Sequence, residues 1–419
     1  MIKPRISYTL GLWLLLPYVF FHLLWRARKQ PEYLKHVSER FGFYLAHSDK
    51  PVIWLHTVSV GETRAAATLV KGLREKYPDH QLLLTHTTPT GRGAGEQLYG
   101  DDILRVYLPY DYPFAVRRFL NHFRPRVGVL LETEIWFNLI HICHTEKIPL
   151  LLLNARLSDK SAGRYARYPN LARSGLRELS AIAAQSTADA DRFATLGGEN
   201  ASVMGNLKFD IEPPPTMLEL GQQLHSRFGG NRKIFLAAST REGEEALILE
   251  AVKYLQVSEL LTVIVPRHPQ RFAEVEAMLV RRGLYFQRRS ENCKVEAKTQ
   301  VVLGDSMGEM FAYYAACDIA FIGGSLLPFG GQNLIEACSV GKPVLIGPHT
   351  YNFTQASQLA VAGGAAVRVQ DAAELALALQ NLFSNPDQMA RIGHAGQLFV
   401  SANRGATERA LFHIGKSLS

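Results

Sequence analysis

Cysteine is scarce in this chain of 419 residues, and its four cysteines are scattered: Cys143, Cys293, Cys317 and Cys338. Small secreted domains held together by disulfides are rich in cysteine, so this class of protein is excluded. Three of the four lie among apolar or helical neighbours. We therefore expect them to be small buried hydrophobic groups in a reducing compartment.

The chain also lacks any signature of a nucleic-acid-binding module. Apolar residues make up 47% of it and charged residues 20%, which excludes disorder, and the length suits two domains. The net charge is +8, and the first fifty residues carry eight Lys or Arg against three Asp or Glu. A basic end beside an apolar segment indicates an anionic lipid partner and no nucleic acid.

Formal charge is absent from Ile6 to Trp25, a run of twenty residues. As a helix this run would extend about 30 Å, the thickness of a hydrocarbon core. No small-residue cleavage site follows it, which argues against a secretory signal. We predict a membrane anchor helix with its basic flank over residues 1–30. The flanking residues are Lys3, Arg5, Arg26, Arg28 and Lys29.

The excess of positive charge after this helix predicts that the globular body lies on the cytoplasmic side of the membrane. A helix that crosses the bilayer and one that lies in its surface both fit the sequence. A buried amino-terminal helix fits the uniform apolarity of the run less well.

The sequence has no convincing metal site. Asp189-Ala190-Asp191 has the D-x-D spacing of a metal–diphosphate site, but it follows Ser186-Thr187 and opens a helix, where acidic residues are favourable. A second group, on one short helix, has no partner set at metal-ligand spacing. We predict no metal. The residues of this second group are His141, Cys143, His144 and Glu146.

Short apolar runs alternate with helical stretches from about residue 50 onward. This alternation predicts the α/β class, with a parallel sheet and right-handed crossovers. The strands predicted in the first half are Val52–Leu55, Gln81–Thr85, Ile103–Leu108, Val127–Leu131 and Leu150–Asn154.

Glu62 and Glu132 follow predicted strands closely enough to lie at the carboxyl edge of the sheet, where ligands bind in open α/β folds. A carboxylate there can offset a helix dipole, or act as a general base beside a substrate hydroxyl. Spacing alone favours the first interpretation for Glu62 and leaves the two balanced for Glu132. Lys208 follows the apolar stretch Ala201–Met204 and should approach the same edge.

Basic side chains gather between residues 156 and 177, interleaved with Tyr165 and Tyr168. Such a run is usually a solvated face. Beside a membrane anchor, it could equally bind an anionic head group. The basic residues are Arg156, Lys160, Arg164, Arg167, Arg173 and Arg177.

The clearest domain boundary is Glu212-Pro213-Pro214-Pro215-Thr216, because three prolines cannot continue a sheet or a helix. A second α/β pattern follows it. We therefore divide the globular part into residues 31–212 and 213–419. The last helix is a candidate to pack back on the first of these domains.

Three segments of the second half combine strand ends with polar or glycine-rich turns. Arg267, after a predicted strand, is either an exposed charge or a phosphate clamp. Ser306 and Glu309 have the spacing of a capping box, whose helix end also suits phosphate. Asn333 and Glu336, after Gly330-Gly331, could bind phosphate and ribose hydroxyls. Together the segments predict a nucleotide site.

Seven blocks of sequence together resemble the 3-deoxy-D-manno-octulosonic acid (Kdo) transferases of lipopolysaccharide synthesis, and the resemblance covers nearly the whole chain. The blocks are His56-Thr57-Val58-Ser59-Val60-Gly61-Glu62, Leu131-Glu132-Thr133-Glu134, Asn154-Ala155-Arg156-Leu157-Ser158, Leu207-Lys208-Phe209-Asp210, Val265-Pro266-Arg267-His268-Pro269, Gly304-Asp305-Ser306-Met307-Gly308-Glu309 and Gly330-Gly331-Gln332-Asn333. The chain departs from the expected motifs at Arg241, Gln332 and Leu334.

The resemblance implies a glycosyltransferase-B fold, with two Rossmann-like domains facing a cleft. It also implies an inverting transfer of Kdo from CMP-Kdo to a lipid A precursor, tetraacyldisaccharide bisphosphate, without a cofactor. Residues 31–212 would bind the acceptor and residues 213–419 the nucleotide. A nucleotide-sugar epimerase of the same fold and a membrane tether that merely binds a nucleotide are the alternatives.

The resemblance also assigns roles to individual residues. Glu62 would be the catalytic base, and Glu132 and Lys208 would assist the transition state. The residues that would contact CMP are Pro266, Arg267, Met307, Gly308, Glu309, Asn333, Leu334, Ile335 and Glu336.

Overall fold

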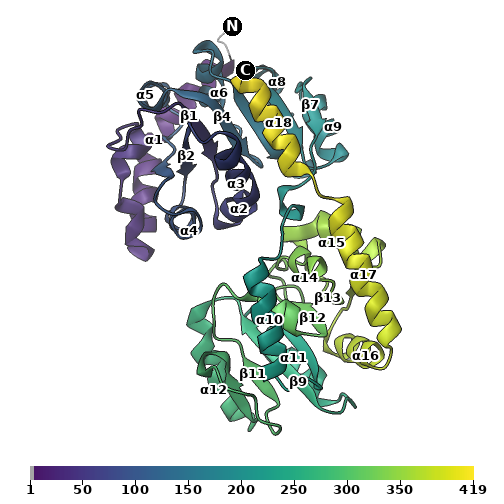
Figure 1. Ribbon diagram of the computed structural model, residues 1–419. Helices are drawn as coiled ribbons and strands as arrows, with labels where there is room; N and C mark the ends of the chain where they lie inside the picture. Colours follow the sequence, from purple (N-terminus) through teal and green to yellow (C-terminus); the bar gives the residue numbers. More distant parts are fainter. Residues whose placement is uncertain (1–3) are drawn as a thin grey trace. The chain divides into compact units, whose positions relative to one another are not determined.

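The computed structural model describes residues 4–419, so Lys3 of the predicted basic flank lies outside the described residues. The chain forms two compact units, which we describe separately. The first unit comprises Met1–Asp210 together with Asn403–Ser419, and the second comprises Ile211–Ala402. The last helix, α18 (Ala406–Leu418), therefore belongs to the first unit (Figure 1).

The first unit is built on a seven-stranded sheet in the order β3-β2-β1-β4-β5-β6-β7. Every pair of neighbouring strands is parallel, as the alternation of apolar runs predicts. The strands are β1 (Val52–His56), β2 (Gln81–His86), β3 (Leu104–Tyr107), β4 (Pro125–Leu131), β5 (Leu150–Ala155), β6 (Ala181–Ala184) and β7 (Ala201–Val203).

Helices cover both faces of this sheet, and an apolar core lies on each face (Figure 1). Trp54 and Phe119 pack in one core, and Leu69 packs in the other with Ala410 and Ile414 of α18. The helices are α1 (Pro4–Lys29), α2 (Val60–Ala65), α3 (Ala67–Lys76), α4 (Pro89–Tyr99), α5 (Pro113–Phe123), α6 (Phe137–Thr145), α7 (Asp159–Tyr165), α8 (Pro169–Arg177) and α9 (Thr187–Thr195), with short 3-10 turns η1 (Pro31–Leu34), η2 (Val37–Phe41) and η3 (Leu207–Phe209).

The second unit repeats the architecture, with a seven-stranded parallel sheet in the order β10-β11-β9-β8-β12-β13-β14. The strands are β8 (Lys233–Thr240), β9 (Leu260–Pro266), β10 (Phe286–Arg288), β11 (Val301–Leu303), β12 (Ile319–Ile322), β13 (Val344–Ile346) and β14 (Ala366–Arg368). The helices are α10 (Pro215–Arg227), α11 (Glu244–Lys253), α12 (Phe272–Arg281), α13 (Met310–Ala316), α14 (Ile335–Ser339), α15 (Thr354–Ala362), α16 (Ala372–Phe383) and α17 (Pro386–Ala402).

Each sheet has a point at which the strand order reverses, between β1 and β4 in the first unit and between β8 and β12 in the second. At such a point the connections leave the carboxyl ends of two neighbouring strands in opposite directions and open a crevice. Glu62 follows β1 and Glu132 follows β4 directly. The topology thus places both acids at the switch point of the first unit.

The long helix α1 is the one helix among residues 4–419 that is long and apolar enough to cross a membrane. It continues through Pro17 and is attached to the unit by polar contacts. The Tyr8 hydroxyl donates to Asp111 at 2.9 Å, and the Tyr112 hydroxyl donates to the carbonyl of Leu12 at 2.7 Å. Further along α1, Leu23 and Ala27 are buried.

Candidate active site

Glu62 lies in the first turn of α2, next to the end of β1. The Ser59 hydroxyl caps this helix by accepting from the Glu62 amide at 3.3 Å, and it donates to Glu62 Oε1 at 2.9 Å. The amide of Val58 donates to Glu62 Oε2 at 2.7 Å. The carboxylate therefore makes the helix-end contacts expected of a capping acid.

These contacts do not make Glu62 an ordinary surface acid, because the carboxyl is largely withdrawn from water. Burial raises the pKa of Glu62 to about 7. The hydrogen bonds from Val58 and Ser59 pull the pKa down, and the charges of Glu132 and Glu134 raise it further. A carboxylate with a pKa near 7 is suited to accept a proton at neutral pH.

Glu132 lies directly after β4, and its backbone φ angle is 63°. Residues other than glycine rarely adopt this conformation. The Nζ atom of Lys208 lies 3.6 Å from Glu132 Oε1. The backbone of Lys208 is fixed in turn, because Asn206 accepts from the Lys208 amide at 3.0 Å. The structure thus brings Glu62, Glu132 and Lys208 together at one edge of the first sheet.

Glu134 is the third acid of this group, and we call Glu62, Glu132 and Glu134 the carboxylate cluster. Burial raises its pKa, and the indole of Trp136 donates to Glu134 Oε2 at 2.5 Å. Glu134 belongs to one of the sequence blocks that resemble the family, Leu131-Glu132-Thr133-Glu134. Its distance from the predicted strand, however, did not suggest a role for it. Burial raises the pKa of Tyr165, from the basic segment, and the charge of the nearby Glu134 raises it further.

The other basic side chains of residues 156–177 are mostly solvated. Arg164, Arg167 and Arg173 are exposed, and Arg177 forms an ion pair with Glu199. This exposure fits both a solvated basic face and a surface that binds an anionic head group, so the two interpretations stay open.

Among residues 4–419, no group of three or more His, Cys, Asp or Glu side chains could hold a metal ion, and the two groups rejected from the sequence make structural contacts. Asp189 accepts from the Leu157 amide at 2.9 Å and lies in the first turn of α9. His141 contacts Glu178 at 3.0 Å on the side of α6. That no metal takes part in the reaction stays a prediction.

In the second unit, basic side chains gather where β8 and β9 end. The pKa of His268 is lowered by partial burial and by the positive charges of Arg241 and Arg267. Arg267 also lies within electrostatic range of the buried Tyr314 phenol, as does Glu336. Two of the residues predicted to contact CMP, Arg267 and Glu336, therefore lie around one side chain.

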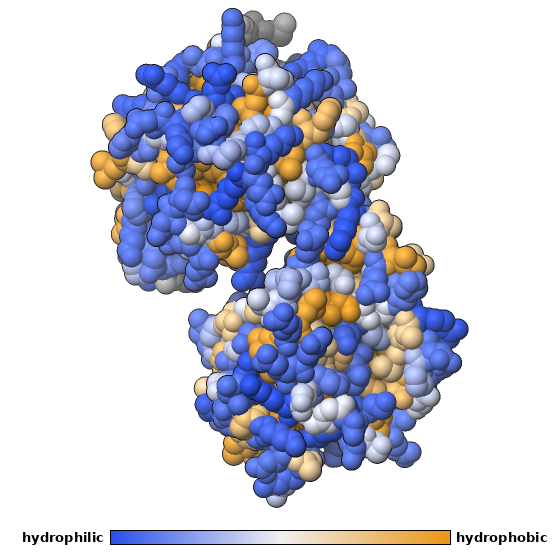
Figure 2. All heavy atoms as spheres, viewed as in Figure 1, coloured by the Kyte–Doolittle hydropathy of each residue, from blue (hydrophilic) through white to orange (hydrophobic). Residues whose placement is uncertain are grey.

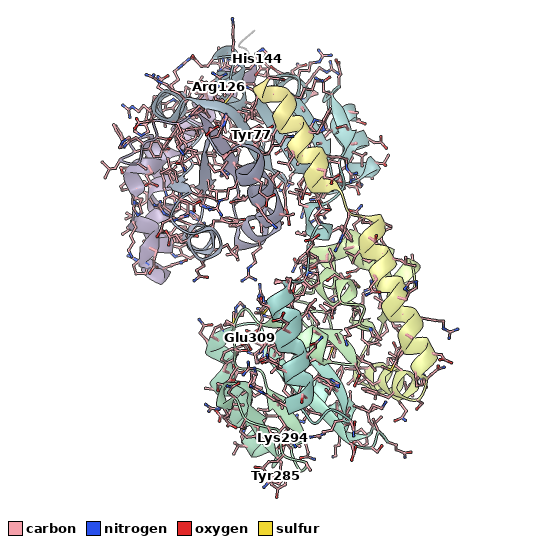
Figure 3. All side chains as sticks on the ribbon, viewed as in Figure 1. Tyr77, Arg126, His144, Tyr285, Lys294 and Glu309 are labelled. Atoms are coloured by element: carbon pink, nitrogen blue, oxygen red, sulfur yellow. The ribbon has the colours of Figure 1, made fainter. Side chains whose placement is uncertain are left out.

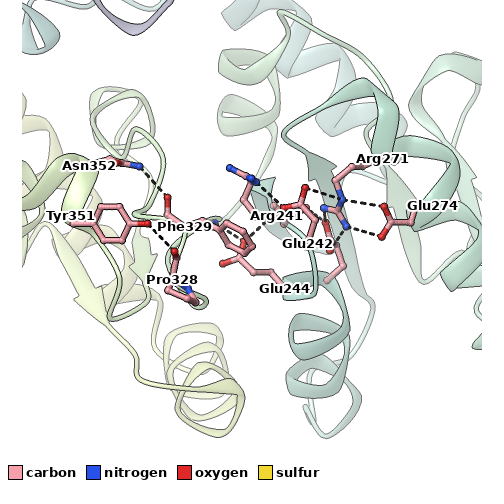
Figure 4. Close-up of polar contacts among 12 residues, drawn as sticks. Arg241, Glu242, Glu244, Arg271, Glu274, Pro328, Phe329, Tyr351 and Asn352 are labelled. Atoms are coloured by element: carbon pink, nitrogen blue, oxygen red, sulfur yellow. Dashed lines mark hydrogen bonds and ion pairs between the residues drawn. The ribbon is translucent and has the colours of Figure 1, made fainter. Parts of the chain in front are cut away.

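Acidic residues fix this basic cluster in position (Figure 4). Arg271 donates to both carboxylate oxygens of Glu245, at 2.5 and 3.0 Å, and also contacts Glu274 at 3.4 Å. Arg241 contacts Glu242 at 3.0 Å and stacks on the ring of Phe329 at 4.5 Å. Positive charge in this setting suits a phosphate-bearing ligand.

Glu244 holds the glycine-rich loop that follows β12. Its carboxylate accepts from the amides of Arg241, Gly324 and Leu326, at 2.9, 2.5 and 2.9 Å. Only glycine fits at position 323, because an added Cβ would lie 2.5 Å from the carbonyl oxygen of Ser239. These contacts, which spacing could not reveal, shape the switch point of the second unit.

The loop from residue 304 to 309 differs from the sequence-based expectation. Ser306 was expected to cap a helix, but its hydroxyl donates to Glu309 Oε2 at 2.7 Å, and α13 begins only at Met310 without a side-chain cap. Glu309, labelled in Figure 3, also pairs with Arg289 at 3.2 Å. Met307 is 52% exposed, and Gly308 has φ 82°.

The contact of Leu334 and Ile335 with CMP stays a prediction, and it could be made only by their main chain. Both side chains are buried in the core, because they form the apolar side of α14. The Ile335 amide is bonded to Asn333 Oδ1 at 3.1 Å, while the Asn333 amide group donates to Glu336 at 3.1 Å. Side-chain contact with a nucleotide is therefore open only to Asn333 and Glu336 in this segment.

Comparison of the sequence with known proteins identifies its family. Residues 35–211 match the family described as 3-deoxy-D-manno-octulosonic-acid transferase (kdotransferase), and residues 231–399 match glycosyl transferases group 1. A 3-deoxy-D-manno-octulosonic acid transferase of Bordetella pertussis is 41% identical over 420 residues, which are 96% of this chain and 97% of the relative.

Two solved structures share the fold at low sequence identity. A glycosyltransferase from Rickettsia africae has a TM-score of 0.59 and 17% identity, covering 88% of this chain and 99% of that one. A UDP-GlcNAc 2-epimerase from Neisseria meningitidis, bound to UDP-GlcNAc, also has 0.59 and 17%, covering 87% and 100%. They confirm the glycosyltransferase-B class of fold without distinguishing the two activities. The full-length relative does distinguish them: the chain belongs to the family of 3-deoxy-D-manno-octulosonic acid transferases.

Proposed function

We propose that the protein transfers Kdo from CMP-Kdo to a lipid A precursor, tetraacyldisaccharide bisphosphate, with inversion at the anomeric carbon. Membership of the family supports the class of reaction. The observation that carries the mechanism is the half-buried Glu62, whose pKa of about 7 suits a general base.

In this mechanism Glu62 accepts the proton of the acceptor's primary hydroxyl. The hydroxyl oxygen forms a bond to the anomeric carbon of Kdo while the bond from that carbon to the phosphate oxygen breaks. CMP leaves with the electron pair on its phosphate. Lys208, held near Glu132, supplies positive charge beside the sugar acid, and both assist the transition state.

The second unit binds the donor in this proposal. Arg267 and the neighbouring basic residues offset the charge that develops on the phosphate, without a metal or other cofactor. The main chain of Pro266, the loop Met307–Glu309, and the polar side chains of Asn333 and Glu336 hold the nucleotide. Leu334 and Ile335 support that segment from the core.

The helix α1 attaches the enzyme to the cytoplasmic face of the inner membrane, and we propose that it lies in the bilayer surface. The unit contacts α1 from Tyr8 to Ala27, and these twenty residues of helix extend about 30 Å. A helix held along this length cannot also cross the hydrocarbon core. The face drawn in Figure 2 is hydrophilic over most of its area, with hydrophobic residues among the hydrophilic ones of the first unit. Large apolar side chains are exposed on α1. They include Leu10, Leu14, Tyr18, Phe21 and Trp25.

One incubation separates this proposal from its alternatives. The protein is mixed with CMP-Kdo and the lipid A precursor in detergent micelles, and the lipid is analysed by mass. A transferase adds the mass of one or more Kdo residues to the lipid. An epimerase changes the nucleotide sugar without modifying the lipid, and a tether changes neither. An unmodified lipid with purified, folded protein would refute the proposal.

A further inference from the structure

A cavity of about 240 Å³ lies in the first unit between α1 and the carboxyl edge of the sheet. Thr87 and Leu108, which follow β2 and β3, line one side, and Leu23 of α1 lines the other. Trp136 also lines it, and the Trp136 indole binds Glu134 of the carboxylate cluster. The cavity therefore lies on the sheet edge that carries Glu62.

Arg40 gives this cavity a buried positive charge. Arg40 is only 3% exposed, and its guanidinium group stacks on the ring of Tyr107, 4.1 Å from the ring centre. One guanidinium nitrogen donates to the Thr87 carbonyl at 3.1 Å, but the Nε atom is buried without a hydrogen-bond partner. The adjacent Glu39 is engaged by Arg92 at 2.9 Å.

None of the ion pairs within residues 4–419 includes Arg40. A buried charge without a counterion is costly, and a buried donor without an acceptor adds to that cost. An anion in the cavity would supply the missing counterion and relieve the first of these costs. Arg26 of α1 also lines the cavity, and its charge reaches the Tyr110 hydroxyl that Arg40 contacts. Two guanidinium groups thus approach the same space.

The remaining walls indicate what kind of anion fits. Tyr18, Val19 and Leu23 of α1 contribute aromatic and apolar surface. The cavity has room for roughly eight water molecules, enough for a phosphate group and the start of an attached chain. Arginine forks match phosphate oxygens, and the adjoining exposed apolar face of α1 suits acyl chains. An amphiphile fits these walls better than a free ion.

We propose that this cavity binds a phosphate group of the lipid acceptor, with Arg40 and Arg26 as its ligands. The identity of the lipid rests on the proposed function. The site would orient the acceptor from the membrane side, with its sugar directed along the sheet edge toward Glu62. Arg40 and Arg26 then determine specificity for phosphorylated lipids.

The test compares Arg26→Gln and Arg40→Gln with Arg28→Gln, an exposed arginine on the same helix. Binding of phosphatidic acid in nonionic micelles is measured by calorimetry on the full chain, with diacylglycerol as the phosphate-free lipid. We expect both cavity variants to weaken phosphatidic acid binding about tenfold or more, and Arg28→Gln to change it less than twofold. Arg40→Lys, which keeps the charge, should restore part of the affinity if Arg40→Gln folds poorly.

Equal binding by Arg26→Gln and the unaltered protein would overturn the proposal. Equal weakening by Arg28→Gln, equal binding of diacylglycerol, or displacement by millimolar inorganic phosphate alone would also overturn it. This measurement needs no CMP-Kdo. If phosphatidic acid binds as expected and no Kdo-lipid forms, the proposed function fails while the site stands.

A kinetic measurement then connects the site to the acceptor. With the bisphosphorylated acceptor, Arg26→Gln should raise KM about tenfold while kcat changes little. With a dephosphorylated acceptor, the same variant should match the unaltered protein. An equal loss on both acceptors would contradict a phosphate site.

Discussion

The ammonium group of Lys208 lies 3.6 Å from a carboxylate oxygen of Glu132. The two residues are 76 positions apart in the sequence, and they meet because β4 ends at the same sheet edge as the η3 turn. The charge of Glu132 holds Lys208 at the site and raises the pKa of Glu62. One residue of the pair therefore influences both the base and the cation of the proposed reaction.

The pair should act as a unit in kinetics. We expect Lys208→Met and Glu132→Gln each to lower kcat strongly, and the double variant to lose much less than the product of the two losses. Initial rates with saturating CMP-Kdo measure this. Strictly multiplicative losses would mean that the ion pair has no role in turnover.

Replacing the proposed base should abolish turnover without abolishing donor binding. Glu62→Gln is expected to lower kcat by about 10²- to 10⁴-fold, because the acceptor hydroxyl loses its general base. CMP affinity, measured by calorimetry, should stay within about twofold because the proposed CMP contacts lie in the second unit. Glu75→Gln, an exposed acid on α3, is the matched control. A Glu62→Gln variant with near-normal turnover would remove Glu62 from the mechanism.

The same substitution should stabilise the protein at alkaline pH. A carboxyl whose pKa rises from 4.5 to about 7 on folding contributes stability that is full below its ordinary pKa. That stability is lost as the pH rises through about 7. Glu62→Gln cannot ionise, so its free energy of unfolding should exceed that of the unaltered protein by about 1 to 3 kcal/mol at pH 8. At pH 5 the difference should be small. Urea titrations at both values test this, and a difference independent of pH would contradict it.

Glu244 should matter for the donor loop and for stability. Glu244→Ala leaves the amides of Gly324, Leu326 and Arg241 without their acceptor, and we expect a loss of about 2 to 4 kcal/mol in unfolding free energy. CMP should bind more weakly because the loop is no longer held. Glu250→Ala, on the exposed side of α11, should change neither quantity. Unaltered CMP affinity in a folded Glu244→Ala variant would separate this loop from donor binding.

The exposed face of α1 should determine membrane association. Leu14 is 84% exposed and Phe21 70%, so Leu14→Asp with Phe21→Asp should release the protein from anionic vesicles in a flotation assay. The core contacts of α1 remain, so the fold should be unaffected. Leu377→Asp, at an equally apolar exposed position of the second unit, is the control. Retention of the double variant on vesicles would show that another surface binds the membrane.

The sequence was informative wherever a function depends on the end of a strand. The apolar runs before Glu62, Glu132 and Arg267 located the sheet edges, and burial of the predicted strands confirms them. The edge strands β10 and β14 were not predicted, because each has only three residues and partly exposed side chains. Their pattern cannot be told from a loop.

Long-range contacts set the limit of this reasoning. Nothing near Arg40 in the sequence indicates that it lies without a carboxylate partner beneath α1. Glu309, which accepts from the Ser306 hydroxyl, also forms an ion pair with Arg289, a residue twenty positions away that the motif did not include. The spacing of residues in the sequence predicts the type of a turn. It does not predict which distant residues contact that turn and so change its hydrogen bonds.

The course of the last helix has a practical consequence for dividing the protein. Asp210 accepts from the amide of Gly405 at 2.7 Å and also from that of Thr407, and Ala406, Ala410 and Ile414 complete the core of the first unit. Expressing residues 4–210 alone would thus expose an unfilled hydrophobic groove, whereas residues 211–402 form a self-contained fragment. A stop codon just before residue 403 would damage the first unit, although it removes only residues that follow the second unit in the sequence.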